Sequence, residues 1–365
     1  MGEVSDVCCH GDHLSVKFDG LQHRFHYFWL RDNCPKSRSS NGQRLHESNA
    51  IDPNISPESV TLGDRGITVQ WADGLTSEYS SGFLIANAYD GVTRASRNFE
   101  TWDVNVKATV VKHDYHQVIA SSQARKAWLE DVSRFGFAML SHVPTVPETL
   151  LDVVSLFGFV RETNYGKLFD VRAEKNASNL AYTPQALSVH TDNPYRDPCP
   201  TLQLLHCLVQ AEQGGITALV DGFAAADRLR KEDPFGFELL TSCDVRFCYH
   251  SDDSYLENTD RVITLDSAGN PRRIRVNNRS MAPLKLPFDQ VQDFYSGMFK
   301  FRDLLEAESA QYRFTMEPGD LVVFDNERVL HGRVGLSIGE RHLQGCYADR
   351  DGLLSTLHGL GGSTQ

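Results

Sequence analysis

The chain has 365 residues, which leaves room for two domains, one of them large enough to bury a sizeable core. Its formal net charge of −12 argues against a nucleic-acid partner or an anionic membrane surface. No basic and apolar leader opens the sequence, and no apolar run approaches the ~18 residues of a membrane span. The eight cysteines form no disulfide or metal spacing, so we expect a reduced, cytoplasmic protein.

The first part of the chain is rich in β-strand signals. Short alternating apolar runs are separated by turn formers such as Asp19-Gly20, a pattern that predicts antiparallel hairpins. The predicted hairpins pair residues 14–18 with 24–28 and residues 60–62 with 67–71. We place a domain boundary near residue 100. Residues 1–100 are therefore predicted to form a small β-rich domain, and residues 101–365 a second, larger one.

The larger domain mixes helices with many short strands. Apolar residues at helical spacing predict helices at residues 115–134, 146–156, 224–231 and 289–307. Apolar or alternating runs predict strands at residues 135–140, 202–208, 217–220, 312–316, 321–324 and 342–347, with a hairpin joining 261–266 to 272–277.

A histidine and an aspartate, His190 and Asp192, stand two residues apart on a predicted extended segment. Side chains at this spacing point to the same face of a strand, so an imidazole nitrogen and a carboxylate oxygen would lie together. Two histidines and one carboxylate form the facial site of non-haem Fe(II) oxygenases, which leaves positions open for other ligands. The best candidate for the missing histidine is His331, on a late strand.

The His-x-Asp spacing alone is a weak signal, because it also begins at His10 and His250. What distinguishes His190 is the late His331, with Arg341 ten residues beyond it. An Fe(II) oxygenase needs two electrons beyond those that its substrate supplies, and 2-oxoglutarate is a common source. The far carboxylate of this co-substrate needs a cation, and arginine offers two parallel hydrogen bonds. The alternative is a surface arginine that begins a strand.

Many short strands, with the metal ligands divided between an early and a late strand, are typical of a double-stranded jelly roll. We therefore predict a mainly β fold with flanking helices. Its catalytic domain would be a double-stranded β-helix (jelly roll), preceded by the small antiparallel β domain.

Four stretches of the sequence together resemble the γ-butyrobetaine hydroxylase and trimethyllysine hydroxylase family of Fe(II)/2-oxoglutarate oxygenases. In chain order, they are residues 29–35 (WLRDNCP), residues 179–183 (NLAYT), His190-Thr191-Asp192 with residues 204–207 (LLHC), and residues 324–342 from FDN to RH. The resemblance implies a jelly-roll enzyme that uses Fe(II), 2-oxoglutarate and O₂. It also implies a homodimer.

The resemblance implies roles for individual residues. Iron would be bound by His190, Asp192 and His331, and 2-oxoglutarate by Arg341, Thr217 and Leu205. Family substrates carry a trimethylammonium head in an aromatic cage, and the matching positions are Tyr165, Phe169, Tyr182 and Tyr347. A quaternary ammonium has no N–H to donate, so aromatic faces and shape must hold it. The alternative to a cage is that these four aromatic residues only pack in the hydrophobic core.

The opposite end of the substrate leaves two candidates open. Asn179 and Asn277 match positions that bind the carboxylate of γ-butyrobetaine. Arg279-Ser280, just beyond, could serve a more highly charged tail, such as that of 2-(trimethylammonio)ethylphosphonate, although Arg279 could equally be a solvated loop residue. Trimethyllysine hydroxylation and a non-catalytic betaine-binding relative remain further alternatives.

The sequence departs from the family in two places. Members commonly hold zinc in the N-terminal domain through Cys-Pro-Cys-x-x-Cys and a later histidine, whereas Cys34 is followed here by the cysteine-free run PKSRSS. One thiolate cannot form a closed tetrahedral site, so we expect no structural zinc. Phe169 also stands where a tryptophan or another large ring is usual.

Overall fold

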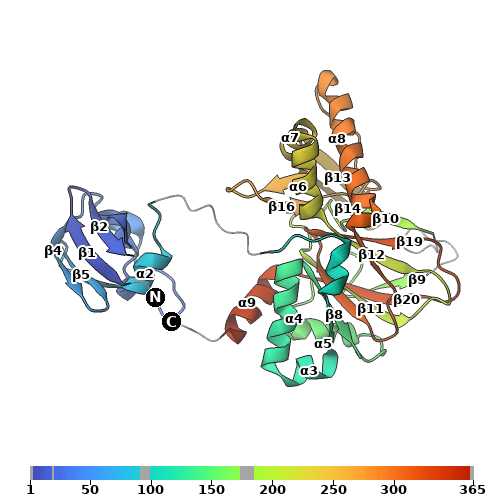
Figure 1. Cartoon of the computed structure of the whole chain (residues 1–365), viewed down its shortest axis with the longest axis horizontal. Helices are drawn as coiled ribbons and strands as arrows, with labels where there is room; N and C mark the ends of the chain where they lie inside the picture. The colour runs from blue at the N-terminus through green and yellow to red at the C-terminus, as the bar shows by residue number, and fades with distance from the viewer. Residues whose placement is uncertain (1–2, 19, 91–98, 173–184, 362–365) are drawn as a thin grey trace. The chain divides into compact units, whose positions relative to one another are not determined.

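The computed structural model describes residues 3–18, 20–90, 99–172 and 185–361. The chain divides into two compact units, Met1–Ser96 and Arg97–Gln365, and each has its own hydrophobic core (Figure 1). The helices within the described ranges include none long and apolar enough to cross a membrane.

The first unit contains two three-stranded antiparallel sheets. The strands of one sheet are β1 (Val4–Cys9), β2 (His13–Phe18) and β3 (Leu21–His26); those of the other are β4 (Pro57–Gly63), β5 (Gly66–Trp71) and β6 (Thr76–Ser80). Both predicted hairpins are present. Tyr27 and Phe28, which were predicted as strand, instead begin helix α1 (Tyr27–Asp32), because Tyr27 and Leu30 are buried at helical spacing. A second helix, α2 (Ser81–Ala86), closes the unit.

Asp32 organises the loop that follows α1. Its carboxylate pairs with Arg44 at 2.8 Å, accepts a hydrogen bond from Ser48 at 2.7 Å and lies 3.3 Å from Nε2 of His46. These contacts hold the segment beyond Cys34, which includes the short 3₁₀ helices η1 (Pro35–Ser37) and η2 (Ser48–Ala50). The absence of structural zinc from this unit stays a prediction.

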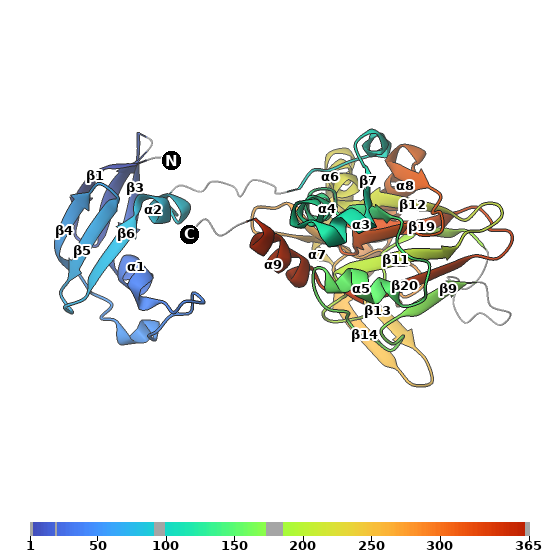
Figure 2. The same cartoon turned by 90° about the horizontal axis from the view of Figure 1, so that it is seen from below.

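The second unit is built on two sheets that share a core. The four-stranded sheet has the order β10 (Leu187–His190), β19 (Val329–Val334), β12 (Ile216–Asp221), β17 (Gln311–Phe314). The six-stranded sheet has the order β7 (Lys112–Asp114), β8 (Phe137–Ser141), β18 (Leu321–Asp325), β11 (Leu202–Val209), β20 (His342–Ala348), β9 (Phe169–Arg172). One hydrophobic cluster contains Leu219 and Val329 from the first sheet with Val322 and Leu343 from the second. This arrangement confirms the predicted mainly β jelly roll (Figure 2).

Helices cover the outer faces of both sheets. The six-stranded sheet packs against α3 (Tyr115–Ala120), α4 (Ser122–Phe135), α5 (Thr149–Ser155) and α9 (Arg350–Leu360). The four-stranded sheet packs against α6 (Gly222–Glu232), α7 (Pro234–Ser242) and α8 (Phe288–Glu306). Two further 3₁₀ helices are η3 (Val104–Ala108) and η5 (Glu308–Ala310).

The single helix predicted for residues 115–134 is in fact two helices. Ser121 has an extended backbone, and its hydroxyl accepts a hydrogen bond from the N–H of Ala124 at 3.3 Å. The serine therefore ends α3 and caps α4. Its hydroxyl competes with the main-chain carbonyls for a backbone N–H, and the spacing of apolar residues does not reveal this competition.

Two hairpins lie between α7 and α8. The first, β13 (Val245–His250) with β14 (Tyr255–Asp260), was not predicted; the second, β15 (Ile263–Leu265) with β16 (Pro271–Ile274), was. After β16 the chain passes directly beside the end of β10, since the N–H of Thr191 donates to the carbonyl of Val276 at 2.8 Å. The hairpins thus bring residues 275–280 to the metal-binding motif.

Candidate active site

The structure brings the three predicted metal ligands together. His190 ends β10, and His331 is its register partner on the neighbouring strand β19, with ring centroids 4.4 Å apart. Oδ1 of Asp192 lies 3.3 Å from Nε2 of His190, and Oδ2 lies 3.9 Å from Nε2 of His331. All three candidate ligand atoms lie within 4.8 Å of one another. In the described part of the chain, this is the one group with such spacing.

The protonation states also suit a divalent metal. Nδ1 of His190 donates to the carbonyl of Ser188 at 2.9 Å, so Nε2 is the nitrogen directed to Asp192. Burial and the neighbouring His190 lower the pKa of His331 to about 3, so its ring is a neutral ligand. Burial alone would raise the pKa of Asp192, but the two imidazoles hold it below its usual value. Asp192 therefore offers a carboxylate and His331 a neutral imidazole, and with His190 they are the residue types of a two-histidine, one-carboxylate Fe(II) site.

A cavity of ≈ 180 Å³ opens beside these side chains and is also lined by Leu205, Thr217 and Arg341. These three residues come from β11, from β12 and from the residue before β20. The guanidinium of Arg341 has no hydrogen bond or ion pair to any described residue. Burial, with a contribution from Arg333, lowers its pKa to about 10, so it stays charged at neutral pH. The cavity thus contains an available cation, which can bind a carboxylate.

Aromatic rings form one wall of this cavity, and we call them the aromatic wall: Tyr165, Phe169, Tyr195, Tyr249 and Tyr347. Neighbouring ring centroids lie 5.0 Å (Phe169 to Tyr347), 6.4 Å (Tyr165 to Phe169), 6.0 Å (Tyr165 to Tyr249) and 5.1 Å (Tyr195 to Tyr249) apart. The sequence predicted Tyr165, Phe169 and Tyr347, whereas Tyr182 lies outside the described residues. Tyr195 and Tyr249 were missed.

The hydroxyl groups of the aromatic wall fix the orientation of its rings. Tyr347 donates to Oδ2 of Asp192 at 3.0 Å, and Tyr195 donates to Oδ1 of Asn193 at 2.8 Å. The hydroxyl oxygens of Tyr165 and Tyr195 lie 3.1 Å apart. Burial raises the pKa of all three phenols, so they stay neutral. The hydroxyl groups of these three rings therefore already bond to protein groups.

The predicted tail-binding residues also line the cavity. Nδ2 of Asn277 donates to the carbonyl of Thr191 at 3.0 Å, and its Oδ1 accepts from the N–H of Arg279 at 3.2 Å. Asn277 is therefore engaged mainly with its own chain. The guanidinium of Arg279 makes no hydrogen bond or ion pair to a described residue, although burial lowers its pKa. Ser280 lies beside it, and Asn179 lies outside the described residues.

Sequence reasoning overlooked one polar cavity residue whose position could have been read from the strand pattern. Gln203 lies two residues before Leu205 on β11, so both face the cavity. Its side chain is 1% exposed, and Oε1 has no hydrogen-bond partner among the described residues. A buried, unpartnered amide oxygen is available to a bound molecule.

One cavity of this jelly roll contains the His-Asp-His group and an arginine that has no hydrogen-bond or ion-pair partner among the described residues. This combination defines a class, the 2-oxoglutarate-dependent dioxygenases, which use Fe(II) and O₂. Residues 98–347 match the model of the family described as "Taurine catabolism dioxygenase TauD, TfdA family", and the chain belongs to this family. Residues 9–85 match "Gamma-butyrobetaine hydroxylase-like, N-terminal". The predicted family resemblance and the predicted enzyme class are confirmed.

Curated relatives match almost the whole chain. It is 38% identical to the gamma-butyrobetaine dioxygenase of Pseudomonas sp. (strain AK-1), over 93% of this chain and 91% of that protein. It is 31% identical to the gamma-butyrobetaine dioxygenase of Homo sapiens, over 95% of this chain and 94% of the relative. The mitochondrial trimethyllysine dioxygenase of Homo sapiens is 30% identical, over 96% of this chain and 86% of the relative.

Proposed function

We propose that this dioxygenase hydroxylates a methylene C–H bond of a small trimethylammonium substrate with an acidic tail. The observation that supports this most directly is the composition of one cavity. The same space is lined by the candidate metal group, by the aromatic wall and by Arg279, whose guanidinium has no ion-pair partner among the described residues. Curated relatives named gamma-butyrobetaine dioxygenase support the same substrate class.

His190, Asp192 and His331 would hold the iron. Arg341, with Thr217 and Leu205, would hold the 2-oxoglutarate. Iron and 2-oxoglutarate, when bound, supply the oxidation: one oxygen atom of O₂ enters the C–H bond, and the other leaves in succinate as CO₂ is released. The protein selects which C–H bond reacts by fixing the substrate at both ends.

The aromatic wall would bind the trimethylammonium head. The hydroxyls of Tyr165, Tyr195 and Tyr347 are directed to protein acceptors or to one another, so at these rings the head meets ring carbons rather than hydrogen-bond donors. A quaternary ammonium is held by such faces through cation–π attraction. Tyr182 is proposed to belong to the same cage, on the family resemblance alone.

The acidic tail would bind near Arg279 and Ser280, with Asn277 and, by resemblance, Asn179. Two tails fit this proposal, the carboxylate of γ-butyrobetaine and the phosphonate of 2-(trimethylammonio)ethylphosphonate. The relatives favour the carboxylate, whereas a free guanidinium beside a hydroxyl favours the more highly charged phosphonate. Trimethyllysine is the weaker candidate, because Asp192 is the only acid among the described residues that line the cavity. Within the described lining, an α-ammonium group would meet no other carboxylate.

A substrate panel tests the proposal. The Fe(II) enzyme would be mixed with 2-oxoglutarate, O₂ and each of γ-butyrobetaine, the phosphonate and trimethyllysine, and succinate and product mass would be measured. We expect one of the first two to yield a product heavier by one oxygen atom, with succinate in equal amount. Hydroxylation only of a molecule without a quaternary nitrogen would refute the substrate class while leaving the enzyme class intact. A homodimer and a cytoplasmic location stay predictions from the sequence.

A further inference from the structure

The main chain around Asp192 is held by Asn326, a side chain with no role assigned from the sequence. Asp192 follows β10 on a segment without regular structure, so the direction of its carboxylate depends on what holds its backbone. Asn326 holds that backbone at two points: its Oδ1 accepts from the N–H of Asp192 at 2.7 Å, and its Nδ2 donates to the carbonyl of Asp192 at 2.9 Å. Nδ2 also donates to the carbonyl of Pro200 at 3.0 Å. Asn326 is 1% exposed, so no water replaces these bonds readily.

The same segment is held from its other side by the residues that follow β16. Arg275 is 3% exposed and donates from Nη1 to the carbonyl of Pro194 at 2.8 Å. The N–H of Val276 donates to Oγ1 of Thr191 at 3.0 Å, in addition to the backbone bond between these two residues. Residues 191–194 are therefore fixed from two directions.

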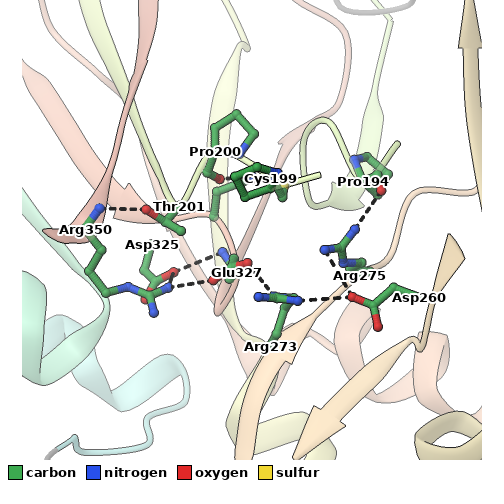
Figure 3. Close-up of polar contacts among 12 residues, drawn as sticks. Pro194, Cys199, Pro200, Thr201, Asp260, Arg273, Arg275, Asp325, Glu327 and Arg350 are labelled. Carbon is green, nitrogen blue, oxygen red and sulfur yellow. Dashed lines mark hydrogen bonds and ion pairs between the residues drawn. The ribbon is translucent and has the colours of Figure 1, made fainter. Parts of the chain in front are cut away.

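A chain of charged side chains ties these two supports to each other (Figure 3). Arg275 pairs with Asp260 at 3.1 Å, Asp260 also pairs with Arg273 at 3.1 Å, and Arg273 pairs with Glu327 at 2.5 Å. Glu327 is the residue next to Asn326, so the contacts close into a ring that includes residues 191–194. Arg275 and Glu327 are buried, so removing the partner of either leaves a buried charge without compensation. The ring therefore resists local displacement.

We propose that Asn326 and Arg275 are positioning residues of the metal centre. They hold the main chain of residues 192–194 so that the carboxylate of Asp192 faces His190 and His331. This inference rests on the proposed role of Asp192 as a metal ligand and is independent of the substrate. Groups that orient a metal ligand commonly affect metal affinity without touching the ion.

Two substitutions test the proposal. Asn326→Asp keeps the size of the side chain but places a second oxygen opposite the carbonyls of Asp192 and Pro200. Arg275→Gln removes the bond to Pro194 and the pair with Asp260. Fe(II) would be titrated without O₂ or substrate, in the presence of 2-oxoglutarate, and the absorption band of the resulting complex would be followed. We expect each variant to bind Fe(II) roughly 10–100-fold more weakly than the unaltered protein.

Arg350→Gln is the matched control. Arg350 pairs with Asp325 at 2.6 Å and with Glu327 at 3.1 Å, but contacts none of residues 191–194. This variant removes charge pairs from the same network and should lower the melting temperature while leaving Fe(II) affinity unchanged. A purely structural role for Asn326 and Arg275 would make all three variants behave alike.

The metal-free melting curve and Asp192→Ala separate the outcomes. A folded Asn326→Asp protein that binds Fe(II) as tightly as the unaltered protein would overturn the proposal, provided that Asp192→Ala has lost binding. If Asp192→Ala also binds normally, the metal assignment itself is wrong. If Asn326→Asp does not fold, Arg275→Gln decides the question by the same comparison.

Discussion

The hydroxyl of Tyr347 donates a hydrogen bond to Oδ2 of Asp192 across 3.0 Å, so one ring of the aromatic wall also touches the candidate metal group. Oδ1 of the same carboxylate faces Nε2 of His190 at 3.3 Å. The two oxygens of Asp192 thus have different surroundings, and the bond from Tyr347 holds the carboxylate plane in one rotation. Tyr347 therefore connects the aromatic wall to the candidate metal group.

Tyr347→Phe separates these two roles. The ring is kept, so the KM of the trimethylammonium substrate should change little, whereas the lost hydrogen bond to a charged group should weaken Fe(II) binding by about 1.5–3 kcal/mol. Fe(II) titration and steady-state kinetics measure the two quantities. A large rise in KM with unaltered Fe(II) affinity would contradict this division of roles.

The metal group itself is tested by alanine substitution. His190→Ala, Asp192→Ala and His331→Ala should each abolish turnover and lower the iron content of the purified protein. His10→Ala and His250→Ala are the controls, because both residues begin the same His-x-Asp spacing but are exposed and belong to no ligand group in the described chain. Full activity of Asp192→Ala would show the assignment to be wrong.

Arg341→Gln should raise the KM for 2-oxoglutarate. The guanidinium has no partner among the described residues, so its charge is available to the co-substrate, and a charge-assisted bond contributes about 1.5–3 kcal/mol, or roughly 10–100-fold in KM. The KM of the trimethylammonium substrate serves as the internal control and should stay the same. An unchanged KM for 2-oxoglutarate would remove Arg341 from the co-substrate site.

The aromatic wall predicts a difference between two substitutions of Tyr165. Tyr165→Ala should weaken substrate binding by roughly 1–2 kcal/mol and increase succinate release without product, because a cation–π face is lost. Tyr165→Phe keeps the face and loses only the contact with the hydroxyl of Tyr195. It should therefore retain most of the affinity.

A substrate analogue tests the same contact from the other side. An analogue with a tert-butyl group in place of trimethylammonium has the same shape without the charge. Equal affinity of the enzyme for the analogue and for the substrate would refute cation–π recognition.

Arg279→Ala distinguishes the two candidate tails. An enzyme for the phosphonate should lose far more kcat/KM than an enzyme for γ-butyrobetaine, because a phosphonate carries more charge for the guanidinium to balance. Arg272→Ala is a matched control: Arg272 is exposed on β16 and does not line the cavity. Both arginines are exposed, so equal effects of the two substitutions would remove Arg279 from the proposed tail-binding site.

The candidate metal group could be predicted from the His190-x-Asp192 spacing once His331 and Arg341 were found later in the chain. His190 and Asp192 are close in sequence, and the need for a second histidine pointed to His331, with Arg341 following from the co-substrate. His190 and His331 line one cavity because their strands, β10 and β19, pair with each other. An alternating apolar pattern predicts such strands well.

Other parts of the site follow from contacts that such patterns do not encode. Tyr249 lies on β13, whose partner β14 is polar and so gave no strand signal. Tyr195 lies in an irregular turn, where neither helical nor strand spacing applies. Asn326 acts through two backbone bonds to a residue 134 positions away. Such a long-range bond cannot be predicted from neighbours in the chain.

In its sheet, β19 lies between β10 and β12, and its His331 is the register partner of His190. During synthesis, β10 and β12 therefore emerge long before the strand that joins them. A nascent chain that ends before β19 contains two of the three candidate ligands but not the strand that aligns them. The candidate metal group is therefore complete only in a chain that includes β19, and iron retention would distinguish such a chain from one that stops before this strand.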